Sequence, residues 1–211
     1  MNIIKLYREG ESSEPGPPDL FGVAAGARRF SIDVPTEVTS ALATGAPVFI
    51  GVSGGRDSQA LAYRVCTHLD DIGHPGPRFL VHADLGRVEW RDSLPVCERL
   101  AQRLGIELVV VRRAAGDMMD RWLSRWSGNV ARYTKLECVK LILPWSTAAQ
   151  RFCTAELKSQ VIAREMRRRF PVGDVVSAVG IRREESAKRA RKGKPVEGFK
   201  QVTGMVAGVK E

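Results

Sequence analysis

The stretch Ser53–Ser58, which reads Ser-Gly-Gly-Arg-Asp-Ser, combines the residue types that bind a phosphate group. It follows an apolar run over residues 47–52 and precedes a helical pattern near 57–72, which predicts a strand, a glycine-rich turn and a helix. Gly54 and Gly55 leave room for an anion to approach the backbone. Backbone N–H groups, the positive end of the helix dipole and two serine hydroxyls then point at one spot. This arrangement favours a phosphate or pyrophosphate as ligand.

The spacing in this loop differs from that of two common phosphate-binding motifs. A Walker A loop ends in Gly-Lys-Ser or Gly-Lys-Thr, and Ser53–Ser58 contains no lysine. The dinucleotide fingerprint requires Gly-x-Gly-x-x-Gly, which the adjacent pair Gly54 and Gly55 does not provide. The alternative is a tight turn without a ligand. The serines and Asp57 beside the glycines favour the phosphate-binding interpretation.

Four apolar runs that alternate with helical patterns predict a parallel sheet with helices on both faces. The strands are predicted at residues 47–52, 78–83, 106–111 and 174–180, and the helices near 57–72, 91–104, 117–126 and 154–170. Gly105 is the expected stop of the helix over 91–104, and Thr154 is the expected N-cap of the last helix. A short helix is also predicted between Pro35 and Gly45.

The other chemically distinctive residues directly follow predicted strands. Asp84 and Gly86 follow the second strand, and Arg182 and Arg183 follow the fourth. Ligands of open parallel sheets bind beyond the carboxyl ends of the strands, so we expect these segments to converge on the Ser53–Ser58 loop. Asp84 fits a hydrogen bond to a ribose or adenine, a contact with Mg²⁺ on phosphates, or a cap of its own turn. The planar guanidinium groups of the two arginines match phosphate or sulfate oxygens.

Three further charged residues have less specific surroundings. Arg151 and Lys158 flank the start of the predicted helix 154–170, where they would either contact an anion or form a charged helix face. Glu89 fits the acceptor side of a reaction, although the sequence slightly favours an ordinary surface carboxylate. The basic run Lys188–Lys194 is expected to be a solvated surface.

The composition indicates a soluble, globular protein with anionic partners. The chain has 211 residues and a net charge of +9, which favours nucleotides, sulfonucleotides or nucleic acid as ligands. No apolar run is long enough to span a bilayer, and residues 1–5 lack the apolar core of a signal peptide. We therefore expect a cytoplasmic protein that does not contact a membrane.

The four cysteines form no Cys-x-x-Cys pair, so zinc-ribbon and local iron–sulfur spacings are absent. Cys66 and Cys97 fall in helical patterns and are predicted to be free, buried thiols. The spacing leaves open whether Cys138 and Cys153 meet in space or share a metal.

Taken in order, four motifs resemble those of the phosphoadenosine phosphosulfate (PAPS) reductase family. This family belongs to the PP-loop ATP pyrophosphatases, or adenine nucleotide α-hydrolases, and is related to the small subunit of ATP sulfurylase. The motifs are the loop Ser53–Ser58, Ala83-Asp-Leu-Gly86 with Glu89, Arg151-Phe-Cys-Thr-x-x-Leu-Lys158, and Gly180-Ile-Arg-Arg-Glu-Glu-Ser186-x-x-Arg189. The resemblance covers residues 47–190 and implies a five-stranded, doubly wound, mostly parallel α/β domain that binds an adenine nucleotide.

The resemblance also implies roles for the matching residues. Ser53, Gly54, Gly55, Asp57 and Ser58 would form the phosphate loop, and Asp84 and Gly86 would lie beside the nucleoside. The candidate catalytic residues are Asp57, Lys158, Arg182 and Arg183, the last three facing phosphate or sulfate. The expected organisation is an N-terminal extension over residues 1–46 that packs on the core, the nucleotide-binding domain over 47–190, and a basic, flexible tail over 191–211.

One departure from the family pattern argues against reductase activity. Sulfonucleotide reductases resemble one another in a C-terminal Glu-Cys-Gly-x-His segment whose cysteine is the nucleophile, and this chain has no cysteine after Cys153. The leading expectation is therefore an enzyme that uses ATP and Mg²⁺, cleaves ATP between its α- and β-phosphates, adenylylates an acceptor and releases pyrophosphate.

Two alternatives stay open. The first is a PAPS reductase that uses Cys153 or a thiol of a partner protein. The second is a non-catalytic subunit that binds a nucleotide, or binds nucleic acid through the basic residues 188–211. A protein partner or a homo-oligomer is compatible with each of these expectations.

Overall fold

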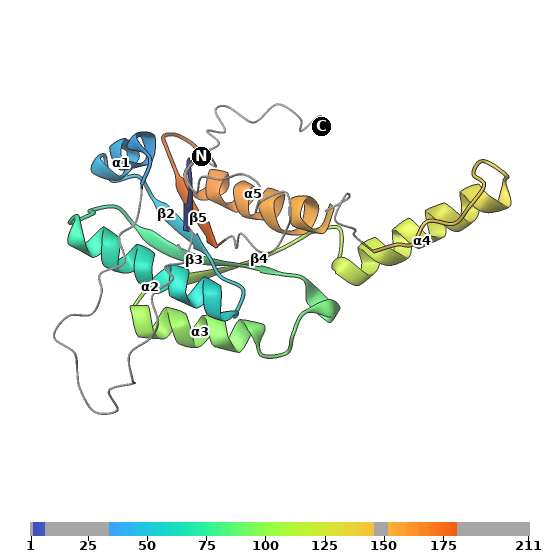
Figure 1. Cartoon of the computed structure of the whole chain (residues 1–211), viewed down its shortest axis with the longest axis horizontal. Helices are drawn as coiled ribbons and strands as arrows, with labels where there is room; N and C mark the ends of the chain where they lie inside the picture. The colour runs from blue at the N-terminus through green and yellow to red at the C-terminus, as the bar shows by residue number, and fades with distance from the viewer. Residues whose placement is uncertain (1, 7–33, 146–151, 181–211) are drawn as a thin grey trace, which may run out of the picture.

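The computed structural model describes residues 2–6, 34–145 and 152–180, and its centre is a five-stranded β-sheet (Figure 1). The strands are β1 (Asn2–Leu6), β2 (Val48–Gly51), β3 (Arg78–Asp84), β4 (Glu107–Arg112) and β5 (Val176–Gly180). They lie in the order β1-β5-β2-β3-β4, and every neighbouring pair is parallel. The predicted α/β class and parallel sheet are confirmed.

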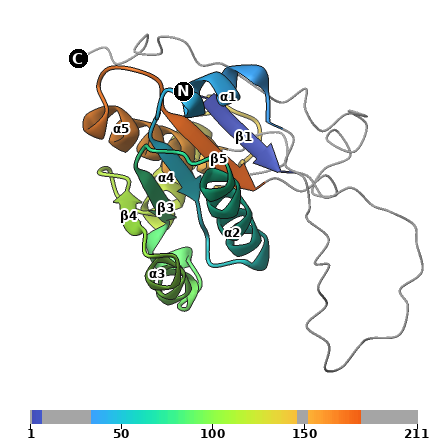
Figure 2. The ribbon, with the colours of Figure 1, turned by 90° about the vertical axis from the view of Figure 1, so that its left-hand side faces the viewer.

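Helices connect the strands and cover both faces of the sheet (Figure 2). They are α1 (Thr36–Ala43), α2 (Arg56–Asp71), the 3₁₀ turn η1 (Gly86–Val88), α3 (Ser93–Leu104), α4 (Met118–Thr134), the π-helical segment η2 (Cys153–Ser159) and α5 (Gln160–Arg169). Buried residues of α1, α2 and α3 form one hydrophobic core with the sheet, and α5 packs in a second.

The alternation of side chains along β2 explains why both cores form. Val48 and Ile50 pack toward the core with α1, α2 and α3, whereas Phe49 packs toward α5, and all three are fully buried. Phe49 stacks on Phe79 with ring centroids 4.7 Å apart and meets Phe170 edge-on at 6.0 Å. A strand buried on both faces needs a continuous apolar run of this kind.

The strand order reverses after β4. From β2 to β4 the chain moves across the sheet in one direction, with α2 and α3 on one face. The connection through α4 and α5 then returns to β5, on the other side of β2, with α5 on the opposite face. The neighbouring ends of β2 and β5 therefore lie where an open α/β sheet binds its ligand.

Three elements differ from the sequence-based prediction. β1 lies in the segment 1–46, for which the only predicted element was a short helix, and it pairs with β5 with Asn2 opposite Val176. The predicted helix 117–126 continues to Thr134 as α4. The predicted N-cap Thr154 is wrong, because η2 begins one residue earlier and Phe152 occupies the cap position. The short helix predicted after Pro35 is confirmed as α1.

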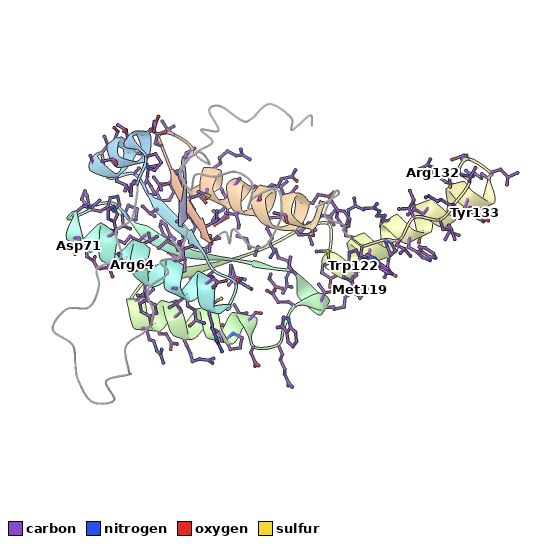
Figure 3. All side chains as sticks on the ribbon, in the orientation of Figure 1. Arg64, Asp71, Met119, Trp122, Arg132 and Tyr133 are labelled. Atoms are coloured by element: carbon purple, nitrogen blue, oxygen red, sulfur yellow. The ribbon has the colours of Figure 1, made fainter. Side chains whose placement is uncertain are left out.

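Residues 118–145, here called the arm, project away from the sheet (Figures 1 and 3). Met118 is the one buried residue of α4. Asn129 Nδ2 donates a hydrogen bond of 2.7 Å to the Ile142 carbonyl, which holds the returning chain beside the helix. Figure 3 shows Met119 and Trp122 near the base of the arm, and Arg132 and Tyr133 near its tip. Among the described residues, no helix is long and apolar enough to cross a membrane.

Candidate functional site

The Ser53–Ser58 loop joins β2 to α2 at the carboxyl edge of the sheet. Gly54 has a φ of +75°, a left-handed conformation that glycine adopts without strain. Gly55 is the N-cap residue of α2, and no side chain caps this end of the helix. The positive end of α2 is therefore directed at the loop, as an anion site requires.

Side chains within the loop brace its backbone. Ser58 is 8% exposed, and its hydroxyl donates a 2.8 Å hydrogen bond to the Gly55 carbonyl and accepts one of 3.2 Å from the Ser53 N–H. Gln59 Nε2 donates to the Gly54 carbonyl at 3.2 Å. Ser53 and Asp57 are exposed at the surface of the loop. The two serines thus have different surroundings, because Ser58 shapes the turn while Ser53 faces solvent.

The start of α3 packs against the Ser53–Ser58 loop. A Cβ atom on Gly54 would lie 2.8 Å from the Ser93 carbonyl oxygen and 2.9 Å from the Ser93 Cα. Real Cβ atoms do not approach backbone atoms this closely, so only glycine fits at position 54. A Cβ on Gly55 would meet nothing closer than Ser53 Oγ, at 3.7 Å. Backbone packing therefore requires glycine at position 54. At position 55 there is room for a Cβ atom.

Asp84 ends β3 and shapes the turn that follows. One carboxylate oxygen accepts a 2.7 Å hydrogen bond from the Gly86 N–H, and the other accepts one of 3.1 Å from Arg112 Nε on the edge strand β4. Burial would raise the pKa of Asp84, but these bonds from Arg112 and Gly86 outweigh it, so the pKa is lower than usual. Asp84 caps its own turn, which is one of the roles the sequence left open.

Arg87 attaches this turn to the base of the arm. Its guanidinium donates to both carboxylate oxygens of Asp117, at 2.7 and 2.9 Å, and also contacts Asp120. Asp117 and Asp120 form a reciprocal capping box at the start of α4. The Arg87 hydrogen bonds hold the pKa of Asp117 well below its usual range. These residues were not predicted, although the spacing of the two aspartates ahead of a helical pattern is a signal for a capped helix.

Glu89 is not the ordinary surface carboxylate that the sequence slightly favoured. Its side chain is 16% exposed, accepts a 3.0 Å hydrogen bond from the Leu85 N–H and lies 3.4 Å from Nε2 of His82. His82 is 1% exposed and was not predicted as a site residue. The sequence could have predicted a polar contact here, because a titratable side chain within the apolar strand 78–83 needs a buried polar partner.

The segment η2 carries Lys158 and is fixed to the arm. Arg121 donates to both carboxylate oxygens of Glu156, at 2.7 and 3.1 Å, and this pairing lowers the pKa of Glu156. The guanidinium groups of Arg121 and Arg125 also lie over the Phe152 ring, at 4.8 and 5.0 Å from its centroid. Lys158 is partly buried two residues after Glu156, in an element that contacts β3.

Arg182, Arg183 and Arg151 lie outside the described residues, as does the basic run Lys188–Lys194. Gly180, the last described residue, nevertheless ends β5 next to the start of α2. A Cβ atom there would be 3.9 Å from the Asp57 carbonyl oxygen. The end of β5 therefore lies beside the Ser53–Ser58 loop.

The cysteines and carboxylates of the described part form no metal site. Cys66 and Cys97 are buried free thiols, as predicted, and burial raises the pKa of each. Cys138 lies in the arm and Cys153 begins η2, and no group of three or more His, Cys, Asp or Glu side chains is arranged to hold a metal ion in the ranges described. The Asp84 and Glu89 carboxylates are already hydrogen-bonded.

A hollow of about 510 Å³ lies away from the Ser53–Ser58 loop, between α1 and the end of α2. Its walls include Leu42, Ile72 and His74, and it is at the opposite edge of the sheet from the loop. None of the predicted site residues lines it.

No protein-family model matches this chain, and no curated protein matches it either.

Proposed function

We propose that this chain is a PP-loop protein with the doubly wound arrangement of the adenine nucleotide α-hydrolases, and that it transfers the adenylyl group of ATP to an acceptor. One observation supports this proposal above all others. The Ser53–Ser58 loop opens α2 at the carboxyl end of β2, beside the end of β5, and its Gly54 is held in a left-handed conformation. An uncapped helix start and a glycine-rich turn at this position suit a pyrophosphate group.

The reaction follows from such a binding mode. An acceptor oxygen attacks the α-phosphorus, the bond from that phosphorus to the bridging oxygen of the β-phosphate breaks, and pyrophosphate leaves. The acceptor loses its proton to water. The loop N–H groups would hold the departing phosphates, and Lys158, Arg182 and Arg183 would neutralise the charge that develops on them. Catalysis of this kind depends on positioning and electrostatic stabilisation.

The test is to incubate the protein with MgATP labelled in the α-phosphate and with candidate acceptors. We expect labelled AMP, free or joined to an acceptor, together with equimolar pyrophosphate. Formation of ADP would mean cleavage at the other phosphate bond and would contradict the proposal, as would the absence of turnover with every acceptor tried.

A sulfonucleotide reductase is the second candidate, favoured by the place of Cys153. This thiol is partly exposed at the start of η2, the segment that carries Lys158. The reductase proposal predicts release of sulfite from PAPS in the presence of a thioredoxin system, and loss of that release in Cys153→Ser. Full activity of the variant would exclude Cys153 as the nucleophile.

A further inference from the structure

A buried histidine connects the two turns of the proposed site. His82 lies near the end of β3, and its Nδ1 is 3.1 Å from the carbonyl oxygen of Val52, the residue immediately before the phosphate loop. Its Nε2 is 3.4 Å from Oε2 of Glu89, which lies just beyond the η1 turn. One imidazole ring therefore spans from the end of β2 to the turn that follows β3.

The two oxygen atoms nearest the ring nitrogens, from Val52 and Glu89, are hydrogen-bond acceptors. A carbonyl oxygen accepts only, and so does an ionised carboxylate. A neutral imidazole carries one N–H, so it would satisfy one of these acceptors and turn a lone pair toward the other. Nε2 is buried and makes no hydrogen bond within the described residues, and its 3.4 Å contact with Glu89 Oε2 is an ion-pair distance. A ring with a proton on each nitrogen satisfies both neighbours at once, and an unsatisfied buried group is costly.

The surroundings of the ring fit a positive charge. Glu89 faces it from the turn after η1, Asp84 lies two residues further along the same strand, and Cys97 of α3 faces it with Sγ 3.7 Å from Nδ1. Glu89 accepts a hydrogen bond from the Leu85 N–H, which fixes its carboxylate in place.

Cys97, His82 and Glu89 do not form a nucleophilic triad, although their types and order suggest one. Cys97 has no exposed surface, and burial raises the pKa of its thiol. A substrate has no access to this sulfur, and the thiol form is a poor nucleophile. The His82 ring is therefore assigned a structural role, through its contacts with Val52 and Glu89.

We propose that His82 is a positioning residue that carries a proton on both ring nitrogens and thereby ties the phosphate loop to the Glu89 turn. The inference rests on the proposed function in so far as the loop binds ATP. Loss of either proton releases one of the two contacts, so the loop is held less firmly and ATP binds more weakly.

The first test counts the ring protons without any nucleotide. Full-length protein labelled with ¹⁵N-histidine is observed by NMR at about pH 7.5, where an ordinary histidine is neutral. We expect both nitrogens of His82 to be protonated in the wild type, and one to lose its proton in Glu89→Gln. The amide of that variant still accepts from Leu85 but removes the charge. Glu98→Gln, an exposed site on α3, is the matched control and should leave both protons in place. A single N–H on His82 in the wild type would overturn the proposal.

The second test links the ring to nucleotide binding. We expect Glu89→Gln to weaken MgATP binding about tenfold, the effect of losing one hydrogen bond to a charged group, and Glu98→Gln to bind like the wild type.

The two tests separate the two proposals. A Glu89→Gln variant that loses a ring proton but binds MgATP like the wild type overturns the positioning role while leaving the proposed function intact. If the wild type itself does not bind MgATP, the proposed function fails and the link to binding fails with it. The proton count on His82 is decided by the nucleotide-free spectra in either case.

Discussion

Gly54 and Ser93 are packed so closely that no side chain fits between them. A Cβ on Gly54 would lie 2.8 Å from the Ser93 carbonyl oxygen, and the φ of Gly54 is +75°. The loop before α2 therefore packs directly against the start of α3. A glycine that the sequence assigns to phosphate binding is required, in this structure, by backbone packing.

The first prediction is that Gly54→Ala destabilises the fold. A residue with a side chain in the left-handed conformation costs about 1–2 kcal/mol, and the contact with Ser93 adds to this. We expect the unfolding midpoint to fall by several degrees, since about 1 kcal/mol corresponds to 2–4 °C in a chain of this size. Thermal unfolding followed by circular dichroism measures the change. A midpoint equal to that of the wild type would show that α3 does not press on the loop.

The second prediction is that Gly55→Val prevents nucleotide binding without unfolding the protein. A Cβ there meets nothing closer than 3.7 Å, so Gly55→Val should keep the fold while its side chain occupies the space a phosphate needs. We expect ATP to raise the unfolding midpoint of the wild type by mass action on the folded state, and not that of the variant. Gly128→Val is the control, because Gly128 in the arm also has open space around it. Stabilisation of Gly55→Val by ATP would place the phosphates elsewhere.

The sequence predicted the sheet well where the evidence is local. Apolar runs such as Val48–Ile50 are needed wherever helices cover both faces, and Gly105 ends α3 in a left-handed conformation as expected. β1 was missed because its pairing is not local: Asn2 pairs with Val176, at the other end of the domain. The start of η2 was misplaced because Thr154 is a good cap by residue type, whereas the helix opens with a π-helical segment that residue type does not reveal.

The candidate site was predictable in part. The loop Ser53–Ser58 was found from its glycines, because their spacing is a local property. The pairing of His82 with Glu89 was missed because it depends on how η1 folds back over β3, and the anchoring of Arg87 on Asp117 joins residues thirty positions apart. Contacts of this kind are set by tertiary structure, and the sequence shows only that a buried histidine needs a partner.

The third prediction concerns the pH dependence of stability. His74 is 6% exposed, its Nε2 lies 3.1 Å from the Ala46 carbonyl, and burial lowers its pKa. The folded protein therefore resists protonation of this ring, whereas the unfolded chain takes up a proton at about pH 6.5. The unfolded state binds more protons at this ring below that pH, so the contribution of His74 to stability should fall as pH decreases from about 7.5 to about 5.5.

The check is to compare unfolding midpoints across this range for the wild type, His74→Gln and His68→Gln. The loss on acidification should be smaller in His74→Gln, even if that variant is less stable throughout. His68 of α2 lines the same hollow, so His68→Gln is the matched control for removing a histidine at this place. Equal slopes for the wild type and His74→Gln would contradict the prediction.

The fourth prediction is that the outer arm contributes little to the stability of the sheet. Met118 is the one buried residue of α4, and the contacts to the rest of the domain lie at the base, through Arg121 and Arg125. Replacing residues 127–141 with a short glycine–serine linker should shift the unfolding midpoint by no more than about 4 °C, which is about 1 kcal/mol.

A core substitution serves as the positive control for a loss of stability in this assay. Leu157 is 1% exposed, and Leu157→Ala should cost about 2–5 kcal/mol. Unfolding of the arm-shortened protein to the same extent as Leu157→Ala would mean that the arm is part of the cooperative core.

The fifth prediction separates two arginines from the basic tail. Gly180 ends β5 so close to the loop that a Cβ on it would be 3.9 Å from the Asp57 carbonyl oxygen, and Arg182 and Arg183 follow two and three residues later. Gly180 therefore brings the chain to the edge of the sheet where we propose that the phosphates bind. A guanidinium close in sequence to that edge can form bidentate bonds to phosphate, whereas a lysine further along the chain loses more entropy on binding and is screened by salt.

We expect Arg182→Ala or Arg183→Ala to weaken ATP binding or turnover by at least about tenfold, equivalent to roughly 1.4 kcal/mol. Neutralising Lys188, Lys192 and Lys194 together should change either quantity little at physiological salt. Titration with MgATP at two salt concentrations distinguishes the sets, because a purely screened contribution disappears at the higher one. If the triple lysine variant lost ATP binding while both arginine variants kept it, the phosphates would bind along the tail and not at the ends of β2 and β5.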